Sequence, residues 1–134
     1  MPLIYSGQEV GNAKRLEFFE KDPIEWQEHE ITAVYKKLAQ IKKENPALAN
    51  GAYGGTMEFV PVNQPDEVLA FERTKDGNSI LAFFNFNNQD VSFMNEDKAF
   101  NAAYENLMDG NGINIDAATA IDLPPYGYLI LRKK

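Results

Sequence analysis

Cysteine is absent from the 134-residue sequence, and His29 is its only histidine. Without cysteine the chain can form neither a disulfide nor a thiolate nucleophile. A zinc site is disfavoured as well, because a single histidine leaves only carboxylates to complete the usual ligand set. We therefore predict no metal, no cofactor and no thiol chemistry, and the sequence indicates no particular compartment.

Basic residues are too few for a nucleic-acid-binding protein. The chain has 13 lysines and arginines against 20 acids, which gives a formal charge of -7. Phosphate binding needs clustered basic side chains to displace counterions. The densest basic group lies within residues 36–43 at helical spacing, as expected for a solvated helix face. No apolar run approaches the ~18 residues of a membrane span. The sequence thus predicts neither a nucleic-acid nor a membrane partner.

The first half of the chain contains one strand-like and one helix-like segment. Residues 1–6 are mostly apolar and end at Gly7, which predicts a short strand with no sequence neighbour to pair with. From about Glu28 to Glu44 apolar residues recur at helical spacing, and Pro46 ends the pattern. The sequence therefore predicts an amphipathic helix whose apolar face consists of Ile31, Val34, Tyr35, Leu38 and Ile41.

After Gly51 the pattern becomes that of short β-strands. Asp76-Gly77 predicts a tight hairpin, because these residues supply the positive φ that such turns require. Regularly spaced turn signals favour a mainly β fold, an antiparallel β-sandwich preceded by the short strand and the helix. The predicted strands are residues 57–62, 68–74, 79–86, 91–94, 103–108, 121–123 and 128–131.

Both faces of the predicted sheet are apolar. The expected core consists of Phe71, Ile80, Ala82, Phe84, Leu129 and Leu131. Leu81, Phe83 and Asn85 then lie on the opposite face, which is unusually apolar for a surface in contact with water. We expect another element to cover that face, and the helix over residues 28–44 is the nearest candidate.

Carboxylate chemistry is the remaining catalytic option. Glycoside hydrolysis needs two carboxylates placed across a sugar, yet only Glu9 follows an apolar strand, where α/β active sites collect their groups. A loop containing Asp109, Asn111 and Asp116 loosely matches a calcium-binding loop. However, Asn114 stands where that motif requires a glycine, and Ala120 stands where it requires a glutamate. We interpret this loop as a turn between strands.

Several motifs, taken in order, resemble glycoside hydrolase family 13, the α-amylase family. Residues 2–9, PLIYSGQE, are similar to the eighth strand of that family's (β/α)8 barrel, and residues 35–48, YKKLAQIKKENPAL, are similar to its last helix. The segments VLAFER (68–73), ILAFFNFN (80–87), YENLMDG (104–110) and IDLPPYGYLIL (121–131) resemble strands of the C-terminal sandwich domain.

The resemblance implies a barrel remnant over residues 1–49 and a C-terminal β-sandwich domain over residues 50–134. It implies that the parent is a retaining glycosidase acting on α-glucans, whose three carboxylates come from barrel strands absent here. We therefore assign no catalytic residue and expect the chain alone to be inactive. Tyr5, Gln8 and Glu9 would lie in a substrate-proximal loop on the active-site face.

Three roles for the chain remain open. The first is structural, with the sandwich bracing the last helix against the parent's catalytic barrel. The second is α-glucan binding through exposed rings, with Tyr53 and Tyr126 as sugar-stacking residues; half-buried strand and turn positions are the alternative interpretation of these rings. The third is a free-standing interaction domain. An unpaired strand at the N-terminus also favours self-association.

Overall fold

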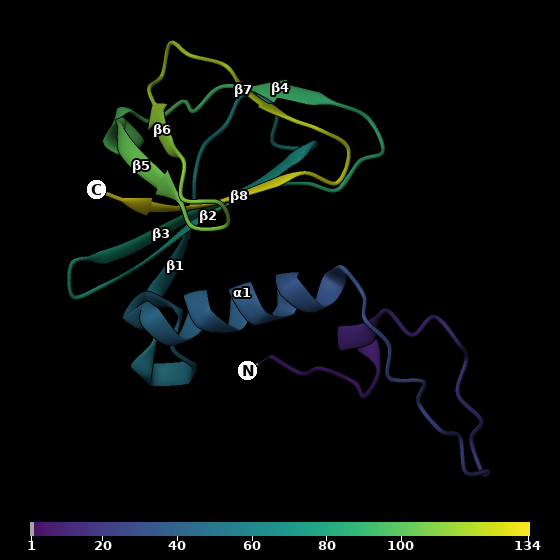
Figure 1. The fold of residues 1–134 in the computed structure, drawn as a ribbon. Helices are drawn as coiled ribbons and strands as arrows, with labels where there is room; N and C mark the ends of the chain where they lie inside the picture. The colour runs from purple at the N-terminus through teal and green to yellow at the C-terminus, as the bar shows by residue number, and fades with distance from the viewer. Residues whose placement is uncertain (1) are drawn as a thin grey trace.

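Alternating apolar residues fold the second half of the chain into two antiparallel sheets. The computed structural model describes residues 2–134 and places one helix before eight strands (Figure 1). These elements are α1 (Ile31–Glu44), β1 (Thr56–Phe59), β2 (Val68–Lys75), β3 (Asn78–Asn85), β4 (Val91–Phe93), β5 (Ala102–Asn106), β6 (Gly112–Ile115), β7 (Ile121–Leu123) and β8 (Tyr128–Lys133). The predicted mainly β fold with one preceding helix is confirmed.

Strand pairing produces one large and one small sheet. The six-stranded sheet has the order β1-β2-β3-β8-β5-β6, and β4 pairs with β7 in a two-stranded sheet. The predicted hairpin joins β2 to β3, where Asp76 and Gly77 have φ values of 49° and 81°. Two consecutive positive φ values give the turn the twist of the flanking strands. Sequence reasoning missed β6, because its residues follow a polar, glycine-containing turn and were predicted to belong to a loop.

The main core lies between the two sheets. Leu81, Phe83 and Leu131 are fully buried there, and Phe93 and Leu123 pack against them from the small sheet. The predicted assignment of faces was wrong for β2 and β3. Leu81 and Phe83 point into the core, whereas Ile80, Ala82 and Phe84, together with Phe71 opposite Ala82, lie on the other face. Alternation identifies the residues that share a face. It does not identify which of two apolar faces meets the second sheet.

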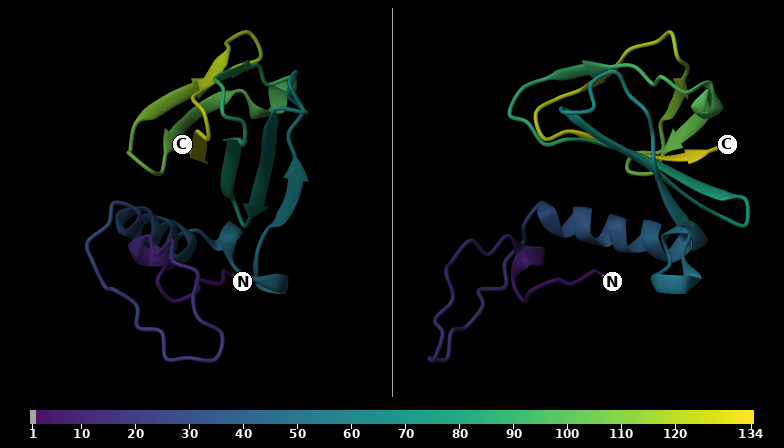
Figure 2. Two further views of the ribbon diagram at one scale, coloured as in Figure 1. Left: turned by 90° about the vertical axis from the view of Figure 1, so that its right-hand side faces the viewer. Right: turned by 180° about the vertical axis from the view of Figure 1, so that it is seen from behind.

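The outer face of the large sheet, which carries Ile80 and Phe84, is turned toward α1 (Figure 2). Ile41 of α1 and Ala47 of the following turn pack on Ile80 and Ile130 in a second apolar cluster. The helix therefore covers part of an apolar sheet face, as predicted, although the face is the one that carries Ile80. Over residues 2–134, no helix is long and apolar enough to cross a bilayer.

The N-terminal segment does not form the predicted strand. Residues 2–6 have no regular secondary structure and are followed by a 3-10 turn, Gln8–Val10. A strand needs a neighbour for its backbone hydrogen bonds, and none of the described strands pairs with this segment. The side chain of Leu3, within this segment, is 87% exposed. Met1 lies outside the described residues. The helix begins at Ile31, a few residues later than predicted.

Candidate functional site

The loop containing Tyr5, Gln8 and Glu9 uses its polar side chains to hold its own backbone. Gln8 Oε1 accepts a hydrogen bond from the Tyr5 N–H at 2.8 Å, and Glu9 Oε2 accepts one from the Gly7 N–H at 3.0 Å. Gly7 has a φ of 96°, a conformation that glycine adopts without a steric cost. The structure thus brings the three predicted loop residues together, with their side chains engaged in local turn contacts.

The start of α1 fixes this loop in place. Thr32 Oγ1 donates to the Glu9 carbonyl at 2.6 Å, joining the loop to the first turn of the helix. The ring of His29 packs so closely on Gly11 that a Cβ there would lie 2.5 Å from it. His29 Nδ1 also accepts the Ile31 N–H at 3.2 Å. The only histidine therefore positions the helix start.

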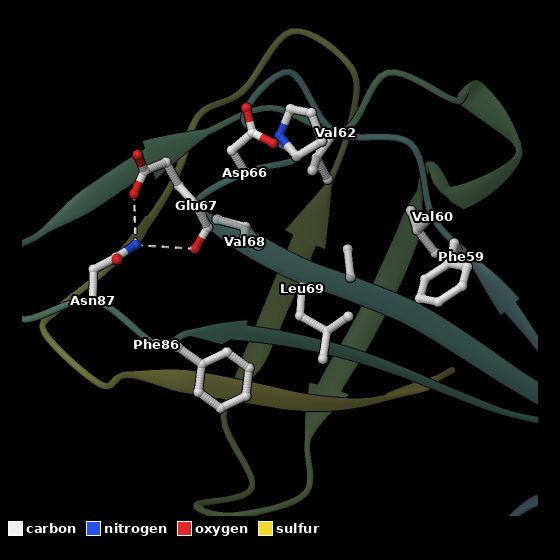
Figure 3. Close-up of a pocket in the computed structure, with 11 residues that line it drawn as sticks. Phe59, Val60, Val62, Asp66, Glu67, Val68, Leu69, Phe86 and Asn87 are labelled. Carbon is white, nitrogen blue, oxygen red and sulfur yellow. Dashed lines mark hydrogen bonds between the residues drawn. The ribbon is translucent and has the colours of Figure 1, made fainter.

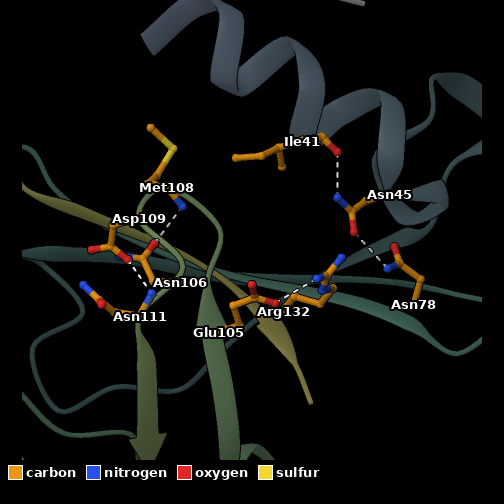
Figure 4. Close-up of polar contacts among 9 residues, drawn as sticks. All are labelled: Ile41, Asn45, Asn78, Glu105, Asn106, Met108, Asp109, Asn111 and Arg132. Carbon is orange, nitrogen blue, oxygen red and sulfur yellow. Dashed lines mark hydrogen bonds and ion pairs between the residues drawn. The ribbon is translucent and has the colours of Figure 1, made fainter. Parts of the chain in front are cut away.

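The end of α1 is joined to the β2–β3 hairpin by two asparagines (Figure 4). Asn45 is 2% exposed, and its Nδ2 donates to the Ile41 carbonyl at 2.7 Å. Asn78 Nδ2 donates to Asn45 Oδ1, and Asn78 Oδ1 accepts the Ala47 N–H, both at 3.1 Å. The bond from Asn45 satisfies one of the last helical carbonyls, which have no partner within the helix, and Asn78 accepts the amide of the turn that follows.

Arg73 holds the segment that connects the helix to β1. Its Nη2 donates to the Ala49 carbonyl at 3.2 Å and to the Gly55 carbonyl at 3.0 Å. A Cβ on Gly54 would lie 2.0 Å from the Ala49 oxygen, so the close approach of these backbones requires glycine. We call the residues that join α1 to the sheet the junction: Ile41, Asn45, Arg73, Asn78, Ile80 and Ile130.

An ion pair closes the rim of the junction. Arg132 Nη2 lies 2.8 Å from Glu105 Oε2, on neighbouring strands of the outer face (Figure 4). Both side chains remain partly exposed, so the pair contributes on the order of 1 kcal/mol or less. The junction therefore depends more on apolar packing and on the hydrogen bonds of Asn45, Asn78 and Arg73 than on this ion pair.

The two predicted sugar-stacking tyrosines are exposed but lie far apart. Tyr53 is 81% exposed, and its carbonyl accepts a bond from Lys75 at the hairpin end of β2. Tyr126 is 66% exposed, and its N–H donates to the Asn87 carbonyl beyond the other end of the hairpin. Eight-residue strands separate these ends by roughly 20–25 Å. The two rings do not form one platform.

Two other exposed rings lie on one face of the sheet. Phe59 and Phe86 line a recess of about 380 Å³ that also includes Leu69, Glu67 and Asn87 (Figure 3). Sequence reasoning missed this pair. The signal was present in part, since Phe84 and Phe86 alternate on one face of β3 and its extension, but the return of β1 beside β2 could not be placed from the sequence.

The loop carboxylates are engaged in turns. Asp116 accepts the Ala118 N–H at 2.8 Å and the Thr119 hydroxyl at 2.9 Å, and these bonds hold the pKa of its carboxyl below the usual value. Asp109 accepts the Asn111 N–H at 2.9 Å. Within residues 2–134, no group of three histidine, cysteine or acidic side chains is arranged to hold a metal ion.

Comparison with protein families adds a match over the β-sheet region. Residues 57–130 match the family model described as maltogenic amylase, C-terminal domain. The chain is 29% identical over 124 residues to alpha-amylase 2 of Dictyoglomus thermophilum, covering 83% of this chain and 20% of that protein. It is 27% identical over 135 residues to maltogenic alpha-amylase of Bacillus acidopullulyticus, covering 97% of this chain and 22% of that one. The chain thus spans about a fifth of the length of these relatives.

A solved structure supports the fold over nearly the whole chain. The crystal structure of a maltogenic alpha-amylase, AmyB, from Thermotoga neapolitana superposes with a TM-score of 0.79 and 21% sequence identity. The superposition covers 98% of this chain and 32% of that one. The helix and the N-terminal segment are therefore included in the shared fold together with the sheets.

Proposed function

The chain belongs to the family of maltogenic amylase C-terminal domains, and from this premise we propose that it is the C-terminal part of an α-amylase-type glycoside hydrolase acting on α-glucans. Residues 50–134 are its β-sandwich domain. Residues 1–49 are the end of its catalytic barrel, with α1 as the last barrel helix. The family match and the amylase relatives support this assignment.

The role of this part of the enzyme is to brace the barrel's last helix. The observation that carries this proposal is the junction, where Ile41 is 4% exposed against Ile80 and Ile130. Burying one such side chain stabilises the packed state by about 1.5–3 kcal/mol. The Asn45–Asn78 contact adds directional bonds that fix the position of the helix along the hairpin.

Next to the side of α1 that packs on the sheet, the helix carries a second apolar surface that the sheet does not cover. Leu38 and Ala39 line a groove with Leu3 and Ile4 of the N-terminal segment. In a (β/α)8 barrel each helix packs its inner side on the strands. The proposed partner of this side is therefore the catalytic barrel, and the sheet domain holds the helix from outside.

The loop after the N-terminal segment has a supporting role in this proposal. Glu9 and Gln8 cap their own turn, and Thr32 ties that turn to α1. Bracing α1 therefore also fixes the loop that, in the parent enzyme, faces the active site. Tyr5, Gln8 and Glu9 contribute by shaping that loop, and the catalytic carboxylates belong to other barrel strands.

An assay of the purified chain tests this proposal. We expect no hydrolysis of soluble starch or of a chromogenic maltoside by the 134-residue chain. Turnover that survives repeated purification and disappears in Glu9→Gln would overturn the proposal, because it would place a complete active site within these residues. Full activity in Glu9→Gln would instead identify a contaminating hydrolase, which mass spectrometry of the preparation would detect.

Sugar binding by Tyr53 and Tyr126 is the second candidate role, and the high exposure of both rings favours it. Affinity electrophoresis in a starch-containing gel measures such binding as retardation. If each ring stacks on a glucose unit, Tyr53→Ala and Tyr126→Ala each reduce the retardation. Because the rings lie at opposite ends of the hairpin, their effects are expected to be independent. Unchanged mobility of both variants would contradict this role.

A further inference from the structure

A recess opens at the edge of the large sheet, where the chain leaves β1 and turns back into β2. Its floor consists of apolar residues, among them Val60 and Val68, which are almost completely buried. Its volume of about 380 Å³ lies within the range of small-molecule sites in proteins. Figure 3 shows Leu69 between the rings of Phe59 and Phe86 along one side of the recess.

The two rings combine high exposure with a common orientation relative to the sheet. Phe59 is 70% exposed and Phe86 is 67% exposed. Phe59 lies opposite Phe71 in the strand register, and Phe86 follows Phe84 by two residues, so both side chains belong to the outer face. Water-exposed aromatic surface is costly to leave uncovered, and two rings beside one recess provide an extended apolar contact area.

Phe86 is held in position by its neighbour. Its ring lies 5.9 Å from that of Phe84 with an interplanar angle of 11°, and Phe84 stacks in turn with Tyr128 at 6.1 Å. A ring supported in this way loses little conformational freedom when a ligand covers it. Preorganisation of this kind raises affinity, because less entropy is lost on binding.

Polar groups lie beside the apolar surface. Asn87 Nδ2 donates to the side chain and to the backbone carbonyl of Glu67, which fixes both side chains at the rim. Asp66 also lines the recess. The carboxylate oxygens accept hydrogen bonds, and the amide oxygen of Asn87 provides a further acceptor. Two carboxylates and an amide are suited to a ligand that carries several hydroxyl donors.

These features exclude an anionic ligand and suit a neutral sugar. No lysine or arginine lines the recess, so an anionic ligand would meet two carboxylates without a compensating cation. A pyranose ring has an apolar C–H face that covers an aromatic ring. The carboxylates of Asp66 and Glu67 lie across β2 from the two phenylalanine rings (Figure 3), so they would meet neighbouring units of a longer chain rather than the stacked unit itself. We propose that the recess between Phe59 and Phe86 is an α-glucan-binding site. The choice of an α-glucan over other neutral sugars rests on the proposed function.

The position of the recess keeps it separate from the junction. Phe86 lies beyond the end of β3 that is opposite the Asp76-Gly77 turn, whereas Asn78 contacts α1 at the turn itself. Binding at the recess therefore does not require α1 to move. A failure of sugar binding would leave the bracing role intact, and hydrolysis by the chain would overturn the bracing proposal without affecting the recess.

The test is titration of the full 134-residue chain with maltoheptaose, followed by amide chemical-shift changes in NMR. We expect the shifts to concentrate at Leu69, Phe86 and Asn87. Phe86→Ala should weaken binding roughly five- to tenfold, the effect of losing about 1–1.5 kcal/mol of ring contact. Phe18→Ala is the matched control, since Phe18 is 88% exposed but lies in the loop before α1.

A second variant tests the polar rim. Glu67→Gln keeps the size of the side chain and removes its charge, and we expect weaker maltoheptaose binding with an unchanged melting temperature. No shift changes at millimolar maltoheptaose, or equal binding by wild type and Phe86→Ala, would overturn the proposal. So would self-association that Phe86→Ala abolishes in the absence of sugar binding, because the rings would then form a protein-docking surface.

Discussion

Two buried asparagines join segments that are distant in sequence, and a third holds a local turn. Asn45, Asn85 and Asn95 are each at most 2% exposed. Asn45 accepts a bond from Asn78 and Asn85 donates to the Pro124 carbonyl, whereas the side chain of Asn95 bonds within residues 95–101. Among the described residues, no buried side-chain nitrogen or oxygen lacks a partner. A buried amide stabilises a fold only while all its bonds are made, because the unpaired group loses its hydration without compensation.

The first prediction concerns Asn45. Asn45→Ala removes the donor to the Ile41 carbonyl and the acceptor for Asn78, and should lower the free energy of unfolding by about 2–3 kcal/mol. Urea denaturation followed by circular dichroism measures this change. Asn50→Ala is the control, since Asn50 is exposed and its side chain does not cap the turn that follows it. Equal stability of the two variants would show that the Asn45 contacts do not hold the junction.

The second prediction concerns Tyr104, whose ring is 1% exposed in the core. Burial, with a smaller contribution from the charge of Glu72, raises the pKa of its hydroxyl to about 12. The unfolded chain releases this proton near pH 10, whereas the folded chain keeps it until about pH 12. The tyrosine's contribution to stability is therefore complete below pH 10 and is lost as the pH rises from about 10 to about 12.

Tyr104→Phe isolates that contribution. Between pH 9 and pH 12, the wild type should lose about 2–3 kcal/mol more stability than the phenylalanine variant, in line with a pKa difference of about two. Urea denaturation at a series of pH values gives the two curves. Parallel curves across this interval would mean that Tyr104 titrates normally in the folded chain. The absolute stability at pH 7 is a separate quantity, since the variant also loses the bond from the hydroxyl to the Phe100 carbonyl.

At the scale of elements, α1 has two apolar sides with different partners. Ile41 packs on the sheet, and Leu38 is 37% exposed in the groove next to the N-terminal segment. The last turn of the helix thus carries most of its contact with the β-domain. The first turn is tied to the N-terminal loop through Thr32. The helix is thus held at both ends and leaves apolar side chains exposed along the groove between them.

The third prediction follows from this asymmetry. Ile41→Ala should lower the free energy of unfolding by about 2–4 kcal/mol, because it opens a cavity between α1 and the sheet. Leu38→Ala should cost less, about 1–2 kcal/mol, since roughly a third of that side chain is already in water and no cavity is closed off. Hydrogen exchange should show faster exchange along α1 only in Ile41→Ala. Similar losses in both variants would contradict a brace formed chiefly by the last turn.

Taken as a whole, the molecule exposes apolar side chains on the N-terminal segment, outside the packed sheets. Leu3 and Tyr5 are 87% and 62% exposed, and residues 2–5 pair with no described strand. Unpaired backbone groups beside apolar side chains favour pairing with another chain. We therefore predict that the chain self-associates through this segment, as its sequence also indicates.

The fourth prediction is that the isolated chain associates with increasing concentration and that Leu3→Asp suppresses this association. Sedimentation equilibrium at several protein concentrations measures the effect. Phe18→Asp is the matched control, because it removes an equally exposed apolar side chain elsewhere and adds the same charge. A monomer at all concentrations would contradict the prediction, and equal suppression by both variants would indicate non-specific association.

Elements with strong local signals could be predicted from the sequence alone. Helical spacing of Ile31 to Ile41 predicted α1, and Asp76-Gly77 predicted the β2–β3 hairpin, because backbone conformation there depends on neighbouring residues. Alternating apolar residues predicted most strands and the mainly β fold. The order of the motifs also led to the family that the comparison then confirmed.

Which apolar face became the core, and which residues lie together at the surface, depends on how distant segments pack. Leu81 and Ile80 are both apolar, and the choice between their faces depends on where β4 and β7 pack. The recess formed by Phe59 and Phe86 likewise depends on strand pairing between distant segments. The residues 2–6 are strand-like in sequence, yet they form no strand here. Such outcomes depend on long-range partners, and local sequence does not determine those partners.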